Sequence, residues 1–137
     1  MIVILIRHAE RESSGADPGL TPAGKRRAKL LAAMFAGTGV TSIFTSEARR
    51  TKETAAPLAA KLGLAPSAID GNTAVAKAQI LAGGPCVLVV GHTNTVPTLI
   101  AALGGPAVTI HEDEFDRMFV LTVPPPASLL SCRYVSV

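Results

Sequence analysis

Two histidines follow the two most continuous apolar runs of the sequence. His8, preceded by Arg7, comes directly after residues 2–6, and His92 comes after residues 86–90 and one glycine. A neutral imidazole nitrogen can attack a phosphorus atom and leave again, and a second imidazole can donate a hydrogen bond to the phosphoryl oxygens. Guanidinium groups add paired donors that match a phosphate dianion. These residue types therefore indicate phosphoryl chemistry, which needs no metal ion and no cofactor.

A second guanidinium can come from Arg49 or Arg50, which stand in the first turn of a predicted helix at about residues 47–62. Each of these residues also has an ordinary structural interpretation. Either arginine can be an exposed helix charge, and the Arg7-His8 pair can lie at the surface. His92 can hydrogen-bond a backbone carbonyl at the start of a helix. Their shared position favours the functional interpretation, because all of them follow predicted strands and are separated by helices that can bring them together.

Apolar runs and turn residues alternate along the chain and predict the elements that position these groups. The predicted strands are 2–6, 40–45, 66–70, 86–90, 117–123 and 129–137, and the predicted helices run from Thr21-Pro22 to Gly37 and over about 47–62, 73–82 and 97–103. Pro57 predicts a kink or a break in the second helix. This order predicts a single three-layer α/β/α domain over residues 1–137, with a mostly parallel central sheet, helices on both faces and an antiparallel C-terminal strand. Ligands of such sheets bind at the carboxyl ends of the strands.

The composition limits the partners that we expect. With 48% hydrophobic residues over 137 positions, the chain is not a disordered one. The charge is only +3, and one Tyr and no Trp argue against a nucleic-acid partner. Lys25-Arg26-Arg27, the longest basic run, is predicted to be a solvated helix face. The opening apolar run ends at Arg7, too early for a signal peptide or a membrane span, so we expect no membrane partner and a cytoplasmic location.

Four short motifs occur in order along nearly the whole chain. They are Ile4-Leu5-Ile6-Arg7-His8-Ala9-Glu10, Leu20-Thr21-Pro22-Ala23-Gly24, the segment Ser46–Ala55 of the form Ser-x-x-x-Arg-x-x-x-Thr-Ala, and Val89-Val90-Gly91-His92 followed by Pro97. Together they resemble the motifs of the histidine phosphatase superfamily, which includes phosphoglycerate-mutase-like enzymes and bacterial phosphohistidine phosphatases. Residues 113–117 resemble the closing segment of one small branch. Ala9 replaces the glycine of the family motif.

The resemblance implies a transient phosphorylation of His8. Arg7, Arg50 and His92 would form the phosphate pocket, with Thr93 beside them, and the third motif selects Arg50 rather than its neighbour. The implied function is a metal-independent phosphatase that acts on phosphate monoesters or phosphohistidine, in a small molecule or a phosphoprotein. The alternatives are a non-catalytic phosphate- or phosphopeptide-binding module of the same fold and phosphotransfer of the phosphoglycerate-mutase type.

None of the four motifs identifies the residue that would protonate the leaving group. Larger family members carry a glutamate in an insert between the third strand and the next helix, whereas the only acid in this region here is Asp70. Asp70 is a candidate donor or a turn former before Gly71. Glu10 and Asp17, in the loop after His8, are rival donors, although Glu10 can also pair with Arg11 or with solvent. A phosphoramidate substrate would need the donor less, and the lack of long inserts predicts an open site.

Overall fold

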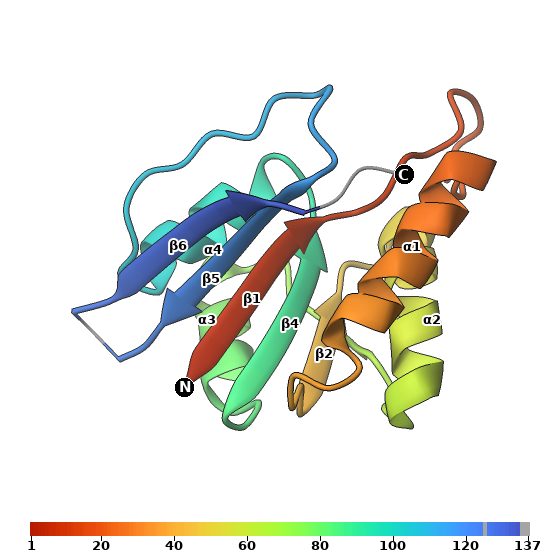
Figure 1. Ribbon diagram of the computed structural model, residues 1–137. Helices are drawn as coiled ribbons and strands as arrows, with labels where there is room; N and C mark the ends of the chain where they lie inside the picture. Colours follow the sequence, from red (N-terminus) through yellow and green to blue (C-terminus); the bar gives the residue numbers. More distant parts are fainter. Residues whose placement is uncertain (125, 135–137) are drawn as a thin grey trace.

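A six-stranded sheet lies between two pairs of helices (Figure 1) in the computed structural model, which describes residues 1–124 and 126–134. The strands are β1 (Ile2–Arg7), β2 (Ser42–Thr45), β3 (Ser67–Ala68), β4 (Cys86–Gly91), β5 (Arg117–Thr122) and β6 (Ser128–Arg133), and the helices are α1 (Pro22–Phe35), α2 (Arg49–Leu62), α3 (Thr73–Leu81) and α4 (Thr95–Ala102). The strand order is β3-β2-β4-β1-β5-β6. The pairs β1–β4, β2–β4 and β2–β3 are parallel, whereas β5 is antiparallel to both β1 and β6. The predicted α/β fold with a mostly parallel sheet and an antiparallel C-terminal strand is confirmed.

The side chains of β1 alternate between the two faces of the sheet and so build two cores. Val3 and Leu5 pack with buried residues of α3 and α4, whereas Ile4 and Ile6 pack with buried residues of α1 and α2. A strand that is covered on both faces needs an apolar side chain at every position, which explains the uninterrupted run in the sequence. The two cores fix β1 at the centre of the sheet.

Several predicted boundaries were wrong by a few residues. Helix α2 begins at Arg49 rather than at residue 47, and it continues through Pro57 without a break because its buried face packs on both sides of the proline. Helix α4 begins two residues before Pro97. The last strand ends at Arg133, and Tyr134, which was predicted to belong to it, lies outside the strand. Residues 135–137 of the predicted range lie outside the described residues, as does Pro125 in the predicted proline turn.

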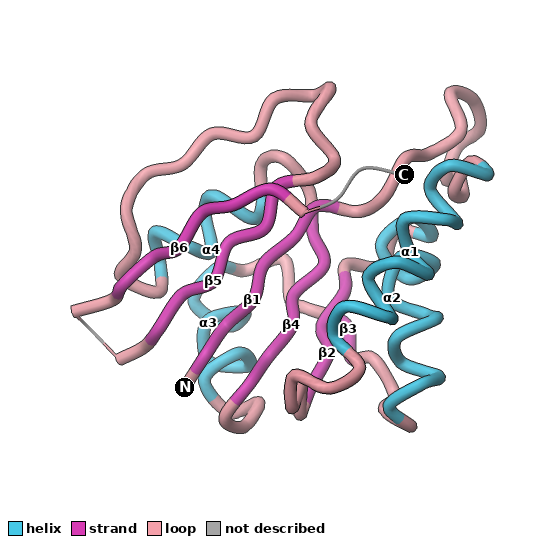
Figure 2. Tube along the Cα trace, viewed as in Figure 1, coloured by secondary structure: helices cyan, strands magenta, loops and turns pink. Residues whose placement is uncertain are grey.

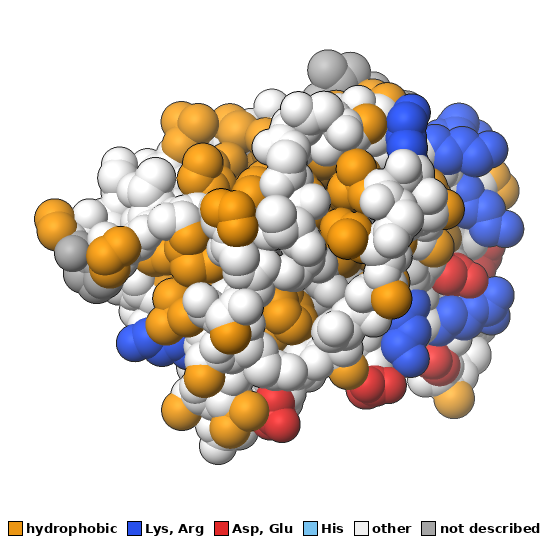
Figure 3. All heavy atoms as spheres, turned by 90° about the horizontal axis from the view of Figure 1, so that it is seen from below, with side chains coloured by type: hydrophobic (Ala, Val, Ile, Leu, Met, Phe, Trp, Pro, Cys, Tyr) orange, Lys and Arg blue, Asp and Glu red, His pale blue; other side chains and the backbone are white. Residues whose placement is uncertain are grey.

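The two ends of the sheet differ in character. The connections that leave β1 and β4 and the long connection that leads into β5 lie at one end (Figure 2). The opposite end, shown in Figure 3, is largely apolar or uncharged, with Lys and Arg side chains gathered on the side of α1 and α2. None of the helices within residues 1–124 and 126–134 is long and apolar enough to cross a membrane.

Candidate active site

The carboxyl ends of β1 and β4 carry the two histidines side by side. These strands pair in parallel with Arg7 opposite Gly91, and the backbone N–H of His8 donates to the Gly91 carbonyl at 2.9 Å. The ring centroids of His8 and His92 lie 5.3 Å apart in an edge-on arrangement. Strands that are neighbours in space therefore bring together two residues that are 84 positions apart in the sequence.

Arg50 reaches the same place from the first turn of α2. Its Nη2 lies 3.4 Å from Nδ1 of His92. Arg49 instead turns outward, where its Nε donates to Glu53 at 2.9 Å and its side chain is 62% exposed. The structure thus groups Arg50, and not Arg49, with the two histidines, as the third motif predicts.

His8 is held in one tautomer and in its neutral form. Its side-chain Nδ1 lies 2.7 Å from the Ala9 carbonyl oxygen, which can only accept, so Nδ1 carries the hydrogen and Nε2 keeps its lone pair. Burial lowers the pKa of His8 to about 4, and the charges of Arg7 and Arg50 act in the same direction against the opposing Ala9 hydrogen bond. At neutral pH, Nε2 of His8 is therefore an unprotonated nitrogen in a residue that is only 3% exposed.

Thr54 ties the His8 turn to helix α2. Its hydroxyl accepts from the Ala9 N–H at 2.9 Å and donates to the Arg50 carbonyl at 2.7 Å. Thr54 is buried, so neither backbone group has water as an alternative partner. The threonine of the third motif thus fixes the position of Arg50 relative to the histidine.

Arg7 is clamped by the connection that precedes β5. Its Nη1 donates to the carbonyl oxygens of Glu112 and Glu114 at 2.7 and 2.9 Å, and its guanidinium lies 3.9 Å from the ring centroid of Phe115. Its Nη2 lies 3.4 Å from a carboxylate oxygen of Glu112. Burial is the main cause that lowers the pKa of Arg7. Arg7 and His8 are only 5% and 3% exposed, and the open site expected from the lack of inserts stays a prediction.

Two buried guanidinium hydrogens in this pocket have no partner. Nε of Arg7 and Nε of Arg50 make no hydrogen bond within residues 1–124 and 126–134. A buried charged donor without an acceptor is costly, and such groups are uncommon in folded proteins. Two of them beside His8 and His92 provide donors for an oxyanion.

The second histidine is oriented by polar neighbours. Its Nε2 lies 2.8 Å from the Ser46 hydroxyl, and its backbone N–H donates to Thr95 Oγ1 at 2.9 Å. Burial lowers the pKa of His92, and Arg50 and Arg7 add to this effect. Thr93, next in sequence, donates its hydroxyl to the Glu112 carboxylate at 3.1 Å.

The acids that the sequence offered as proton donors make other contacts. Both carboxylate oxygens of Glu10 accept from Arg27, at 2.8 and 2.9 Å, so its ion-pair partner is Arg27 and not Arg11, the partner offered as an alternative to the donor role. Burial opposes ionisation, but Arg27 outweighs it and lowers the pKa of Glu10. Arg27 itself is buried, so only the first two residues of the basic run form a solvated face. Asp17 accepts from the Arg49 N–H at 3.0 Å and caps the start of α2.

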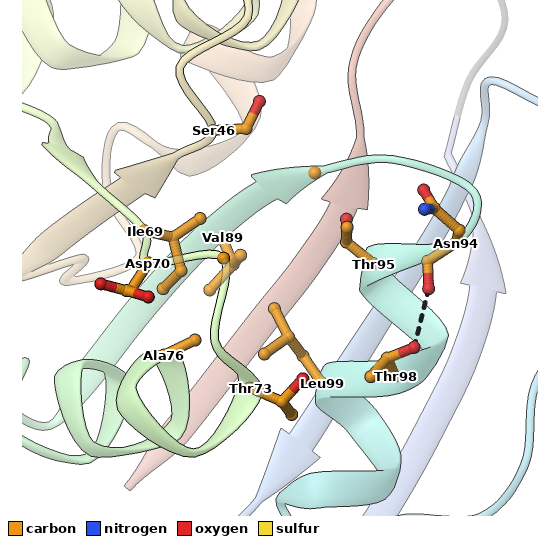
Figure 4. Close-up of a pocket in the computed structure, with 12 residues that line it drawn as sticks. Ser46, Ile69, Asp70, Thr73, Ala76, Val89, Asn94, Thr95, Thr98 and Leu99 are labelled. Atoms are coloured by element: carbon orange, nitrogen blue, oxygen red, sulfur yellow. Dashed lines mark hydrogen bonds between the residues drawn. The ribbon is translucent and has the colours of Figure 1, made fainter.

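Asp70 lines a cavity next to His92, because the Ser46 hydroxyl that contacts the His92 ring lines the same cavity. Its carboxylate is exposed and accepts from the Asn72 N–H at 2.8 Å, which is the geometry of a turn former. The cavity has a volume of about 230 Å³ and lies between α3, α4 and the end of β4, with Ser46 at its upper edge (Figure 4). Its lining combines polar and apolar side chains: Ser46, Ile69, Asp70, Thr73, Ala76, Val89, Asn94, Thr95, Thr98 and Leu99. The structure does not bring Asp70 into hydrogen-bonding contact with the arginines or histidines of the pocket.

Glu112 is the pocket residue that the sequence did not suggest. It lies 105 residues from Arg7, in a connection without a regular element. The sequence pointed to Glu112 only through its position directly before residues 113–117, which resemble the closing segment of one small branch of the family. No spacing rule links this position to β1, because the contact depends on how the connection crosses the end of the sheet.

Comparisons with known proteins agree with this arrangement. Residues 3–73, more than half of the chain, match the histidine phosphatase superfamily (branch 1). The PE-PGRS family protein PE_PGRS11 of Mycobacterium tuberculosis is 32% identical in an alignment 117 positions long, which covers 79% of this chain but 20% of that protein's length. The chain thus spans about a fifth of this relative.

Two solved structures show the same fold. The protein histidine phosphatase SixA, in complex with tungstate, superposes with a TM-score of 0.78 at 20% identity over 97% of both chains. A mycobacterial glucosyl-3-phosphoglycerate phosphatase gives a TM-score of 0.65 at 16% identity over 88% of this chain and 89% of that one. The fold is therefore that of known phosphatases, and with the family match over residues 3–73 the chain belongs to the histidine phosphatase superfamily (branch 1).

Proposed function

We propose that this chain is a phosphatase that hydrolyses a phosphate monoester or a phosphohistidine through a phosphorylated His8, without a metal ion. One observation carries the proposal. A buried, neutral His8 with a free Nε2 shares its pocket with two buried guanidinium N–H groups that lack acceptors within the described residues. This combination supplies a nucleophile and an anion-binding site at the same sheet end.

The proposed chemistry has two half-reactions. In the first, Nε2 of His8 attacks the phosphorus atom and the bond to the leaving group breaks, while Arg7, Arg50 and His92 donate hydrogen bonds to the phosphoryl oxygens. In the second, water attacks the phosphorus atom of the phosphohistidine, inorganic phosphate leaves and neutral His8 returns. The Ala9 carbonyl holds the imidazole orientation through both steps.

A cavity of about 230 Å³ lies beside the proposed pocket. Arg7, His8, Arg50 and His92 do not line it, but Ser46 does and contacts His92, so it is the place we propose for the part of the substrate that carries the phosphoryl group. Glu10 is held in its ionised form by Arg27, which argues against it as the proton donor. The proposed donor must therefore come from elsewhere in the pocket.

The test is hydrolysis of p-nitrophenyl phosphate in the presence of a chelator. We expect turnover by the wild type, loss of at least about 10³-fold in His8→Ala, and acid-labile phosphate on the wild-type chain after rapid quenching. His111→Gln is the matched control, because His111 is an exposed histidine outside the pocket. Full activity of His8→Ala, or no acid-labile phosphate in an active wild type, would contradict the proposal.

A substrate panel separates the alternatives. It compares phosphohistidine peptides, sugar phosphates and the aryl phosphate by kcat/KM. Tight binding of phosphate without hydrolysis of any substrate would instead support the binding module. Transfer of the phosphoryl group to a second position of the substrate, in place of release to water, would support mutase chemistry.

A further inference from the structure

Glu112 places a carboxylate directly against the proposed phosphate pocket. One of its oxygens lies 3.4 Å from Nη2 of Arg7, and the other accepts the Thr93 hydroxyl at 3.1 Å. Arg7 precedes His8, and Thr93 follows His92, so this carboxylate bridges the two strand ends that carry the histidines. An acid in this position lies beside Arg7, which is one of the residues proposed to bind the phosphoryl group.

The backbone of Glu112 is anchored at the pocket, whereas its side chain lies in solvent apart from the contacts with Arg7 and Thr93. Its carbonyl oxygen accepts from Nη1 of Arg7 at 2.7 Å, and this anchors the residue at the pocket. The side chain is 84% exposed, so the packed interior does not restrict its rotation. A carboxyl group on an anchored backbone can therefore reach the outer side of a bound phosphoryl group, where the leaving group departs.

The neighbouring acid of the same segment differs in each of these respects. Glu114 is buried, and its carboxylate pairs with both Arg117 and Arg133 and caps the His111 N–H. These contacts hold Glu114 in place and use its oxygens. The segment therefore contains one structural glutamate and one whose carboxylate faces the pocket.

We propose that Glu112 is the general acid and base of this site, a role that rests on the proposed phosphatase function. In the first half-reaction, Nε2 of His8 forms a bond to phosphorus, the bond from phosphorus to the ester oxygen breaks, and the proton of the Glu112 carboxyl moves to that oxygen. In the second, the Glu112 carboxylate takes a proton from water as its oxygen attacks phosphorus and the bond to nitrogen breaks. The carboxyl is thereby restored, and the alcohol and inorganic phosphate are the products.

Such a role has a signature that a structural role lacks. Protonation by a general acid contributes about 10²–10⁴-fold where the leaving oxygen is strongly basic, and little where it departs readily as an anion. Phenyl phosphate and p-nitrophenyl phosphate have nearly the same shape but leaving groups of different basicity. The ratio of their kcat/KM values therefore reports proton donation and is insensitive to a general loss of binding.

The experiment measures kcat/KM for both esters in wild type, Glu112→Gln, Asp113→Asn and Asp70→Asn. Asp113 is the matched control, because it is the adjacent exposed acid and its change removes the same charge. We expect Glu112→Gln to lose about 10²-fold on phenyl phosphate and no more than about threefold on p-nitrophenyl phosphate, with Asp113→Asn unchanged on both. Urea unfolding confirms that the exposed substitutions leave the fold intact.

Three results would overturn the role. An equal loss on both esters would show that Glu112 only helps to bind or position the substrate. Faster turnover or tighter binding of inorganic phosphate by Glu112→Gln would show that the carboxylate merely repels or shields the pocket. A selective loss on phenyl phosphate in Asp70→Asn, with Glu112→Gln normal, would assign the role to Asp70. If the wild type hydrolyses neither ester and forms no phosphohistidine, the proposed function itself fails.

Discussion

Replacing Glu10 by glutamine is expected to destabilise the fold and to leave the chemistry largely intact. Both oxygens of Glu10 accept from Arg27, whose side chain is only 5% exposed. Glutamine keeps one acceptor but removes the charge, so the guanidinium of Arg27 stays buried without its counter-ion. The Tyr134 ring that lies 5.3 Å from this guanidinium cannot replace a carboxylate.

The size of the effect follows from the burial of the pair. Removing one partner of a fully buried ion pair costs about 3–5 kcal/mol, whereas exposed pairs contribute about 0–1 kcal/mol. The Glu10 side chain is 24% exposed and glutamine retains one hydrogen bond, so we expect the free energy of unfolding to fall by about 2–3 kcal/mol. For a chain of this length, that lowers Tm by roughly 10 °C.

The assay is urea unfolding followed by far-UV circular dichroism, because the chain has no Trp and one Tyr. Glu47→Gln is the control, since the Glu47 side chain is 75% exposed in its pair with Lys52 and its loss should change stability by less than about 0.5 kcal/mol. The pKa of Glu10 is lowered in the folded state, so its stabilisation is complete above the unfolded pKa of about 4.3 and is lost as the pH falls through the folded pKa. The difference in the free energy of unfolding between wild type and Glu10→Gln should therefore be largest at neutral pH and should decrease under acid conditions.

Glu10→Gln should have little effect on catalysis, because the Glu10 carboxylate pairs with Arg27. We expect kcat/KM for phenyl phosphate, measured well below Tm, to fall by less than about fivefold, which is far from the 10²–10⁴-fold expected for a general acid. Unchanged stability together with a loss of that larger size would refute the structural role and make Glu10 the donor.

Three further outcomes follow from the same contacts. The imidazole of His8 should stay neutral down to about pH 4 in an NMR titration, and a midpoint near the ordinary value would contradict its burial. Arg50→Lys should lower kcat/KM for p-nitrophenyl phosphate by about 10²-fold, whereas the outward-facing Arg49→Lys should change it by less than about threefold. Gly24→Ala should reduce the free energy of unfolding in urea by about 2–3 kcal/mol, because the added Cβ would overlap the carbonyl oxygen of Glu10.

Much of the fold was predictable because it depends on patterns that are local in the sequence. The apolar run of β1 and the Thr21-Pro22 helix start are short-range signals, and the structure contains both elements. The predicted break at Pro57 was wrong, because the packing of α2 on the sheet stabilises a continuous helix against a local preference. Local propensity thus located the elements, and tertiary contacts set their ends.

For the site, the sequence by itself determined which residues stand at the carboxyl ends of the strands. A parallel sheet brings such ends together. The sequence alone was therefore enough to group Arg7, His8, Arg50 and His92 at one end of the sheet. The choice of Arg50 over Arg49 came from the resemblance of residues 46–55 to the family motif.

Only the tertiary structure decided what the acids do. Glu10 meets Arg27 because α1 packs against the loop after β1, and Glu112 meets Arg7 because a connection of irregular conformation crosses the sheet end. Neither contact follows from hydrophobic periodicity or from a strand-end rule, since both join loop positions to distant segments through side-chain geometry. The proposed nucleophile could be named from a pattern of a few residues, whereas the acid proposed to assist it depends on where a loop more than a hundred residues away comes to lie.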